Sequence, residues 1–370
     1  MRIAMLLSGG VDSSTALYQL QRRHPEAEIH AYYLKIWLED ELAYLGDCPW
    51  EEDLSYARAV CEQLSVPLHI SNLQKDYFDR VVSYTIDELK AGRTPSPDIF
   101  CNQRIKFGTF LDAVADDYDL VASGHYAQLE RDEHGRTHLL QAPDPVKDQT
   151  YFLSQLSQTQ LSRLIFPIGG MMKQEVRELA SRAELATCTR PDSQGICFLG
   201  KLKYRDFVAH YLGTKEGAIV EQETGEELGT HKGFWFHTVG QRQGLGLSGG
   251  PWYVSGKDLD RNIVYVSHSS ELGQGRSKRL RAGEASWTLT KPEPGRYSAK
   301  LRHGPAMMGA ELHYTDEGYL DITLDAPDRG LAPGQFAVLY RGEECLGSAK
   351  ILEDLDAAAS ATTIQGAARA

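Results

Sequence analysis

The sequence predicts an α/β protein in which an N-terminal parallel-sheet domain precedes a small β-rich domain and a C-terminal β-barrel. Apolar strand-like runs alternate with amphipathic helical stretches up to about residue 203, and this order favours a parallel sheet covered by helices. Beyond that point glycine becomes frequent and short β-type runs lie between turn residues. A chain of 370 residues is long enough for two or three domains.

The first domain is expected over residues 1–203. Strands are predicted at Arg2–Leu7, Glu28–Leu34, Pro67–Ile70 and Asp119–Ala122, and helices at Val11–Arg23, Glu51–Leu64 and Phe107–Ala115. One face of the second helix carries Leu54, Ala57, Cys61 and Leu64. This spacing is typical of a helix packed against a sheet.

Two further domains and a tail are expected beyond residue 203. Residues 204–275 form the β-rich middle domain, with β-type runs at Phe234–Thr238, Trp252–Val254 and Asn262–Val266. Residues 276–355 have the spacing of a small barrel, with runs at Tyr297–Arg302, Ala310–Tyr314, Leu320–Leu324 and Phe336–Tyr340. The Ala-rich residues 356–370 lack apolar periodicity and are predicted to be a disordered tail.

Composition excludes several classes of protein. No stretch of about 18 apolar residues occurs and the N-terminus lacks a signal-peptide pattern, so we expect a soluble cytoplasmic protein. Six scattered cysteines without a CxxC pair fit reduced cytosolic thiols. The net charge of −12 argues against indiscriminate nucleic-acid binding but leaves room for a local basic channel. Two basic clusters are either solvated faces or RNA contacts: Lys201, Lys203 and Arg205, and Arg276, Lys278, Arg279 and Arg281.

A polar, glycine-containing loop follows the first predicted strand and opens the first helix. It comprises Leu7, Ser8, Gly9, Gly10, Val11, Asp12, Ser13 and Ser14. The glycines let an anion approach the backbone, and the helix N-terminus adds unpaired N–H groups. Without the Gly-Lys-Ser/Thr end of a Walker loop, it is expected to hold pyrophosphate rather than a transferring γ-phosphoryl group. The alternative is a capped helix after a glycine turn, and Asp12 either caps it or contacts Mg²⁺ through water.

Two cysteines lie in loop-like contexts. Cys101 follows a Pro-rich stretch in TPSPDIFCNQRIKFG, before a predicted helix and close to Arg104 and Lys106, and Cys197 lies in RPDSQGICFLG. A thiol near a helix N-terminus and cationic side chains has a lowered pKa. Each cysteine alone is more typical of an inert buried thiol, but the pair beside a nucleotide loop favours thiol chemistry.

The chain resembles the tRNA-specific 2-thiouridylase (MnmA) family of the PP-loop ATP pyrophosphatase superfamily nearly end to end. The matching strings are SGGVDSS, TPSPDIFCNQRIKFG, ASGHYA, KDQTYFL, DSQGICFLG, HTVGQRQGLGL, PWYV and APGQFAVLY. The resemblance implies an adenine-nucleotide α-hydrolase-like first domain, a tRNA-contacting middle domain, and 2-thiolation of the wobble uridine of tRNA. The uridine C2 oxygen would be adenylated, and sulfur would arrive as a persulfide from a donor protein.

Residue roles follow from the resemblance position by position. Leu7–Ser14 would hold ATP with Mg²⁺ at its phosphates, and Leu34 and Gly124 would line the adenosine pocket. Cys197 would receive the persulfide, Cys101 would be its partner thiol, and Asp98 is a third candidate catalytic residue. The implied tRNA contacts are Ser96, Pro97, Asp98, His125, Lys147, Asp148, Gln149, Arg302, His303 and Gln335.

The chain departs from the family pattern at two of these positions. The family usually has Asn and Tyr where this chain has Ser96 and His303. The shorter Ser96 puts its base contact in doubt, whereas His303 can still stack on or hydrogen-bond a nucleotide. The expected partners are tRNA and a sulfur donor, the expected state is a monomer, and no residue is assigned as a metal ligand.

Two other functions and one variant of the same reaction also fit the sequence. A PP-loop ligase would need the ATP loop but no thiol, and a non-catalytic tRNA-binding protein would keep a relic nucleotide site. A third variant replaces the persulfide with an iron–sulfur cluster on Cys101, Cys197 and Asp98. Among weaker candidates, structural roles are expected for Cys61, Cys345 and Cys48, and Cys188 is a spare thiol. Arg242 either binds phosphate or is a solvated turn residue.

Overall fold

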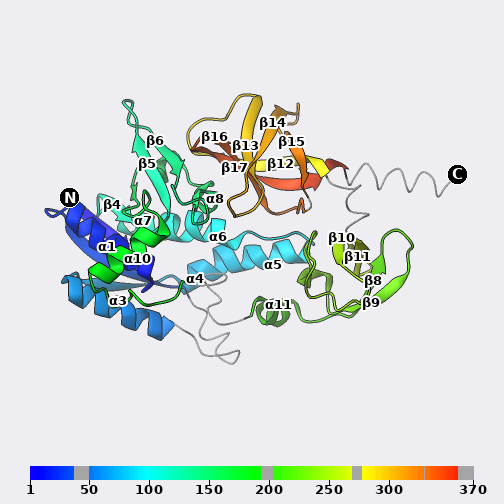
Figure 1. Cartoon of the computed structure of the whole chain (residues 1–370), viewed down its shortest axis with the longest axis horizontal. Coiled ribbons are helices and arrows are strands. Elements are labelled where there is room, and N and C mark those ends of the chain that lie inside the picture. The colour runs from blue at the N-terminus through cyan, green and yellow to red at the C-terminus, as the bar shows by residue number, and fades with distance from the viewer. Residues whose placement is uncertain (37–49, 193–202, 269–276, 329, 357–370) are drawn as a thin grey trace.

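The computed structural model describes residues 1–36, 50–192, 203–268, 277–328 and 330–356, in three parts (Figure 1). The first part is built on a parallel sheet of strand order β3-β2-β1-β4-β7. Its strands are β1 (Arg2–Leu6), β2 (Glu28–Lys35), β3 (Leu68–Asn72), β4 (Leu120–Ala122) and β7 (Leu164–Ile165). The predicted α/β fold class is thus confirmed. In the described residues, no helix is both long and apolar enough to span a bilayer.

Strand β1 divides the core of this domain between the two faces of the sheet. Because neighbouring side chains of a strand point to opposite faces, Ile3 and Met5 pack into one apolar cluster and Ala4 and Leu6 into another. The first cluster includes buried residues of α1 (Val11–Arg23) and α3 (Trp50–Leu64), and α10 (Lys173–Arg182) packs beside α1. Leu54, Ala57 and Cys61 of α3 are buried as predicted, and Leu64 is half-buried.

The second face is covered by a series of helices with two π-helical segments. They are α4 (Gln74–Tyr77), η2 (Phe78–Val82), α5 (Ser83–Lys90), α6 (Pro97–Phe100), η3 (Cys101–Thr109) and α7 (Phe110–Val114). In η3 the wide i→i−5 pattern is visible where Phe110 N donates to the Ile105 carbonyl. The predicted helix Phe107–Ala115 therefore starts at Pro97, and Cys101 lies inside a helix rather than in a loop before one. Proline suits the first helical position because its missing N–H has no intrahelical partner there.

The middle part combines one helix with a four-stranded sheet of order β10-β11-β8-β9. Its elements are α11 (Tyr204–Leu212), β8 (Gly217–Glu221), β9 (Glu227–His231), β10 (Trp252–Asp258) and β11 (Ile263–His268). The β-type run predicted at Phe234–Thr238 is wrong, because its apolar residues Phe234–Phe236 form a 3₁₀ turn. Helix α11 was not predicted, and its Phe207 is buried in the core of the first domain.

The C-terminal part is the predicted β-barrel, made of six strands that close through the pairing of β12 with β17. They are β12 (Ser277–Trp287), β13 (Gly295–Lys300), β14 (Met308–Tyr314), β15 (Leu320–Asp328), β16 (Phe336–Arg341) and β17 (Glu344–Asp354). A hairpin of the first domain, β5 (Ala127–Arg131) and β6 (Thr137–Gln141), extends this sheet through the Glu344–Leu140 pair. Short helices α8 (Thr150–Leu153) and α9 (Gln158–Leu161) follow the hairpin.

Candidate active site

The glycine-containing loop lies where β1 ends and α1 begins. Gly9 has φ +76°, and a Cβ there would lie 2.1 Å from the Asp53 carbonyl oxygen, so only glycine fits. Gly10 occupies the N-cap position without a side chain to bond the first turn, and the Ser8 and Ser13 hydroxyls are 3.1 Å apart. The loop thus presents a helix N-terminus and hydroxyl groups, a setting that favours an anion.

Residues from both neighbouring strands flank this loop. Gly124 follows β4, and a Cβ at this position would lie 2.8 Å from Ser13 N, so the chain after β4 runs directly against the start of α1. Leu34, near the end of β2, is half-buried. The strand order reverses between β1 and β4. Crevices at such switch points, beyond the carboxyl ends of parallel strands, are where α/β sheets bind ligands.

A network of ion pairs joins this loop to residues far along the chain. Lys173 Nζ lies 2.6 Å from Asp12 Oδ1 and 2.8 Å from Asp192 Oδ1. Lys147 Nζ lies 2.6 Å from the other Asp192 oxygen, and Arg177 also pairs with Asp192. Burial raises the pKa of the Asp192 carboxyl, but bonds from Lys147 and Lys173 outweigh it and hold that pKa well below its usual range.

This network bonds Asp12 and also holds Asp192, which precedes the segment with Cys197. Oδ1 of Asp12 accepts bonds from Lys173 and from the Tyr126 hydroxyl (2.7 Å), and Gly10, not Asp12, is the N-cap of α1. A contact of Asp12 with Mg²⁺ stays a prediction. Asp192 is the last described residue before the segment that carries Cys197. Just before it, Arg190 donates to the Gly9 carbonyl at 2.7 Å. Cys197 itself lies outside the described residues.

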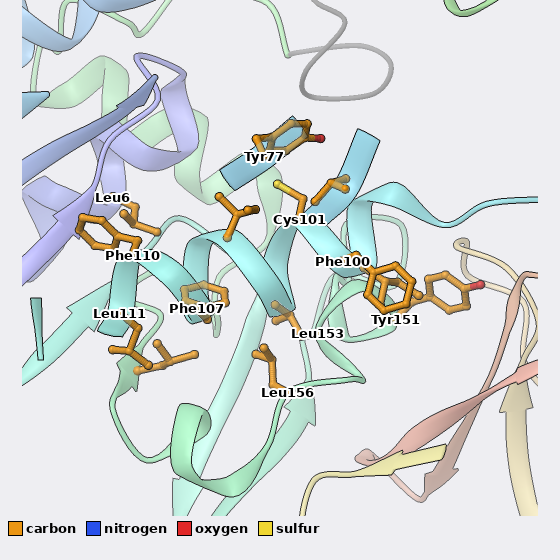
Figure 2. Close-up of a cluster of buried hydrophobic side chains, with 14 of the residues drawn as sticks. Leu6, Tyr77, Phe100, Cys101, Phe107, Phe110, Leu111, Tyr151, Leu153 and Leu156 are labelled. Carbon is orange, nitrogen blue, oxygen red and sulfur yellow. The ribbon is translucent and has the colours of Figure 1, made fainter. Parts of the chain in front are cut away.

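Cys101 lies in the apolar core on the other face of the sheet. It is fully buried, at 0% exposure, among side chains that include Phe100 and Tyr77 (Figure 2). Arg104, one of its predicted cationic neighbours, packs 3.7 Å over the Phe100 ring and donates to the Arg80 carbonyl. Cys101 lies in the second turn of the helix that starts at Pro97, not before its N-terminus, and its surroundings are apolar. The activated thiolate remains a prediction.

All three parts of the molecule hold the turn at residues 91–96, which leads into Cys101. From α5, Glu88 accepts two hydrogen bonds from Arg93 (2.7 and 2.8 Å) and one from Lys350 of the barrel (2.9 Å). Thr94 N donates to the barrel's Pro333 carbonyl at 2.8 Å. Lys257 of the middle domain donates to the Gly92 carbonyl at 2.9 Å. In Figure 1 the barrel and the middle domain both lie toward the C-terminal end of α5.

Several predicted tRNA-contacting residues lie near this turn. Ser96 is half-buried and its N–H donates to the Tyr84 hydroxyl at 3.3 Å, while Pro97 is buried as the first residue of α6. Asp98 is half-buried. His303 stacks on Phe152 with ring centroids 4.6 Å apart. The structure therefore packs His303 of the barrel against a residue of the first domain.

Other predicted tRNA contacts are engaged inside the protein. Asp148 is buried and pairs with Lys300 at 2.7 Å, each side chain being 1% exposed. His125 is buried against Phe107 and lies 2.8 Å from the Ser123 hydroxyl, and burial lowers its pKa well below the usual value. Direct contact with RNA at either residue requires local opening.

The remaining predicted contacts are also bonded within the chain. Lys147 is tied to Asp192, and Gln149 accepts from Tyr126 N at 2.9 Å. Arg302 pairs with Asp328, and the half-buried Gln335 bonds through its backbone to Ile351. The assignment of these residues to RNA stays a prediction.

The other described cysteines are buried or half-buried, whereas several of the basic candidate residues are exposed. Burial raises the pKa of the Cys61 thiol to about 11 and that of Cys345 to about 12, Cys188 is half-buried, and Cys48 lies outside the described residues. Lys203, Arg205 and Arg242 are exposed. Among the described members of the second basic cluster, Arg279 is bonded to Asp356 and Arg281 to Asp321, whereas the Lys278 ammonium donates to the Asp325 carbonyl. Lys201 and Arg276 lie outside the described residues.

Sequence reasoning missed the residues that bind the loop to Asp192. Lys173, Arg177 and Arg190 are ordinary surface types in the sequence, and no motif spacing connects them with Asp12. Only the string that contains Asp192 and Cys197 pointed to this part of the chain.

Comparisons with known proteins divide the chain in the same three parts. Family models match the tRNA methyl transferase HUP domain at residues 1–201, the tRNA methyl transferase PRC-barrel domain at 205–268 and the aminomethyltransferase beta-barrel domain at 277–351. The chain is 46% identical to tRNA-specific 2-thiouridylase MnmA 1 of Bacteroides thetaiotaomicron over 95% of its length and 99% of the relative's. It is 44% identical to the MnmA protein of Parabacteroides distasonis over 96% and 99% of the two chains.

A more distant likeness exists among solved structures. A 4-thiouridine synthetase in complex with RNA and ATP aligns with a TM-score of 0.34 and 17% identity, covering 54% of this chain and 45% of that one.

Proposed function

This chain belongs to the MnmA family of tRNA-specific 2-thiouridylases, and from that premise we propose how its residues replace oxygen by sulfur at C2 of a tRNA uridine. The proposed target is the wobble uridine, and ATP is split to AMP and pyrophosphate. The protein is proposed to act as a cytoplasmic monomer that receives sulfur from a donor protein.

One observation carries the proposal. Lys173 joins Asp12 of the nucleotide loop to Asp192, which precedes Cys197 by five residues. A loop suited to phosphate is therefore fastened to the start of a segment that carries a thiol. A ligase without thiol chemistry has no need of that link.

The nucleotide loop supplies the activation step. The C2 oxygen of uridine is a poor leaving group, and its adenylation makes AMP the leaving group instead. N–H groups at the start of α1 and the Ser8 and Ser13 hydroxyls stabilise the phosphates of ATP. Gly124 and Leu34 are proposed to bound the adenosine pocket.

We propose that Mg²⁺ enters with the phosphates of ATP, as it does where one or two carboxylates and the substrate phosphates bind it. Among the described residues, no group of three or more His, Cys, Asp or Glu is arranged to hold a metal ion, and Oδ1 of Asp12 is bonded to Lys173 and Tyr126.

The two cysteines supply the sulfur step. Cys197 carries a persulfide whose terminal sulfur attacks C2, AMP leaves, and the Cys101 thiolate then attacks the Cys197 sulfur to release the thiolated base. Alternatively, Cys101 attacks first and the hydrosulfide set free attacks C2. Both routes join Cys101 and Cys197 in a disulfide that an external thiol must reduce before the next turnover.

The burial of Cys101 sets a condition on both routes. Its thiol is fully buried in this structure, so it must become accessible before it can reach Cys197. The target base must also leave the anticodon stack to enter the site. We propose that RNA docking at the turn of residues 91–96 both exposes the Cys101 thiol and moves the target base out of the anticodon stack.

The test is a complete reaction with substitutions at each thiol. The protein is incubated with ATP, Mg²⁺, a persulfide donor and unmodified tRNA, and thiouridine is measured by mass spectrometry. Cys101→Ser and Cys197→Ser should reduce thiouridine to background, and Cys188→Ser, a half-buried matched control, should not. Thiouridine formation by both single variants would refute the thiol mechanism. Iron in anaerobically purified protein would instead favour the cluster variant.

A further inference from the structure

A cavity of about 370 Å³ lies between α11 and the sheet of the middle domain. Its volume falls in the range of small-ligand sites, roughly 300–1,000 Å³. The wall contributed by α11 includes Arg205 and Asp206, and the opposite wall includes Lys232, Phe236 and His237. None of these residues has a role in the reaction described above.

His237 is the residue that indicates a ligand. It is 3% exposed, and neither ring nitrogen has a hydrogen-bond partner among the described residues. Burial lowers its pKa to about 4, so the ring is neutral at pH 7 and offers one N–H donor and one acceptor. Buried polar side chains are nearly always hydrogen-bonded, and a ligand in the adjoining cavity would provide the missing partner.

The charges at the cavity favour an anionic ligand. Arg205 and Lys232 are exposed, and neither makes an ion pair within the part of the chain that the structure describes. Asp206 lies beside Arg205 on α11, so a negative ligand group must approach Arg205 and Lys232 rather than Asp206. The Arg205 guanidinium lies 5.4 Å from the centroid of the Phe236 ring, so a cation and an aromatic ring meet across the cavity. Unpaired bases stack on such walls in RNA-binding proteins.

Helix α11 connects this cavity to the thiol region. Phe207 of α11 is fully buried in the apolar cluster that contains Cys101, and Phe236 packs against the same cluster. The helix starts directly after the segment that carries Cys197. An occupant of the cavity would therefore lie against the helix that connects the two cysteine-bearing regions.

We propose that this cavity binds one unpaired nucleotide of the RNA substrate, with its phosphate on Arg205 and Lys232 and its base against Phe236 and His237. The inference rests on the proposed tRNA substrate and adds a second nucleotide site, separate from the one that takes the target uridine. Its function is to anchor the RNA while the target base enters the catalytic domain.

The first test removes the two cations at the cavity in the full-length protein. The double variant Arg205→Met/Lys232→Met should bind unmodified tRNA more weakly, with a salt dependence shallower by about one phosphate contact. When salt rises from about 50 to about 200 mM, the affinity of the variant should then fall by a factor about threefold smaller than that of wild type. Lys215→Met, an exposed lysine of the same domain outside the cavity wall, should match wild type.

Kinetics separate anchoring from chemistry. The double variant should show a raised KM for tRNA and an unchanged kcat for thiouridine formation. His237→Phe keeps an aromatic ring but removes both nitrogens, and it should weaken tRNA binding without changing the salt slope. Should that variant misfold, the exposed double variant still decides the question, with its fold checked by circular dichroism.

Each outcome bears on the proposal. Wild-type tRNA affinity and salt slope in the double variant would overturn it. So would uridine monophosphate binding that depends on Arg205 and Lys232 while tRNA binding does not, because the cavity would then serve a free nucleotide. If the wild-type protein makes no thiouridine, the proposed function fails, whereas the RNA-binding comparison still tests the cavity.

Discussion

The proposed nucleotide loop lies at the carboxyl end of β1, and Cys101 lies in the core on one face of the same sheet. The two regions differ in how ready they are for the proposed chemistry. The loop presents serine hydroxyls and the N-terminus of α1, and ion pairs around Asp12 and Asp192 hold it in place. Cys101 is sealed in an apolar cluster at 0% exposure. One half of the site is therefore preformed, and the other must open.

This difference suggests an order of events. ATP can bind a loop whose groups are already positioned, without RNA. The proposed sulfur transfer needs an accessible Cys101. The turn at residues 91–96 is bonded to both the barrel and the middle domain, so we expect RNA bound there to act on the helix that carries Cys101. Such gating would keep the reactive thiol away from solvent between turnovers.

The largest effect is expected from Gly9→Ala. The new Cβ would lie 2.1 Å from the Asp53 carbonyl in a backbone with φ +76°, so the loop must deform and pyrophosphate release should fall to background. The measurement is tRNA-dependent pyrophosphate release. A Cβ at Gly10 would lie 3.5 Å from its nearest neighbour, Ser8 Oγ, which is an ordinary contact distance. The Gly10→Ala protein should therefore melt close to the wild-type temperature. Normal pyrophosphate release by Gly9→Ala would contradict the assigned loop geometry.

Asp192→Asn should strongly reduce thiouridine formation. The substitution leaves Lys147, Lys173 and Arg177 without their shared carboxylate and frees the start of the Cys197 segment. ATP binding should be less affected than sulfur transfer, which single-turnover assays can separate. Asp260→Asn, at an exposed carboxylate of the middle domain, is the control. Equal losses in both steps would mean that Asp192 serves the loop alone.

A smaller effect is expected from Glu88→Gln. The amide leaves the charges of Arg93 and Lys350 without their buried carboxylate, at a cost of about 1–3 kcal/mol in the free energy of unfolding. If the turn transmits RNA contact to Cys101, kcat for thiouridine should fall while ATP binding is kept. Lys90→Met, on the exposed side of the same helix, is the control. A loss of stability with unchanged kcat would leave Glu88 with a purely structural role.

The smallest effect concerns the joint between the first domain and the barrel. A hydrogen bond to Glu344 (2.6 Å) raises the pKa of His138, and Asp132 adds to this. Because the folded pKa is raised, the stabilisation is complete below the unfolded pKa of about 6.5 and is lost as pH rises through the folded value. Glu344→Gln should flatten this pH dependence, by less than about 1 kcal/mol. Identical pH profiles of the two proteins in urea unfolding would contradict it.

The sequence predicted the regular parts of the fold and failed where tertiary contacts or unusual helices decide. Val11–Arg23 matches α1 to the residue, because its periodicity and the preceding glycines agree. The π-helix at Cys101–Thr109 does not follow a period of 3.6 residues, so the predicted helix begins at Phe107 whereas the observed one begins at Pro97. At Phe234–Phe236 an aromatic run suited a strand, but packing against the core of the first domain turned it into a 3₁₀ turn.

The candidate site was predictable where motif strings are local. The loop Leu7–Ser14 lies between strand and helix as expected, because both features follow from adjacent residues. The links among Asp12, Lys173 and Asp192 join residues up to 161 positions apart, and a single sequence holds no record of such pairing. The burial of Cys101 likewise depends on side chains from several elements.

The rate at which Cys101 is alkylated tests the account most directly. The full-length protein is treated with a thiol reagent alone, with ATP, and with ATP and unmodified tRNA, and labelled peptides are quantified by mass spectrometry. We predict slow labelling of Cys101 in the first two cases and rapid labelling when tRNA is present, while Cys345, which is also fully buried, stays slow throughout. Labelling of Cys101 at one rate under all three conditions would contradict an RNA-opened thiol.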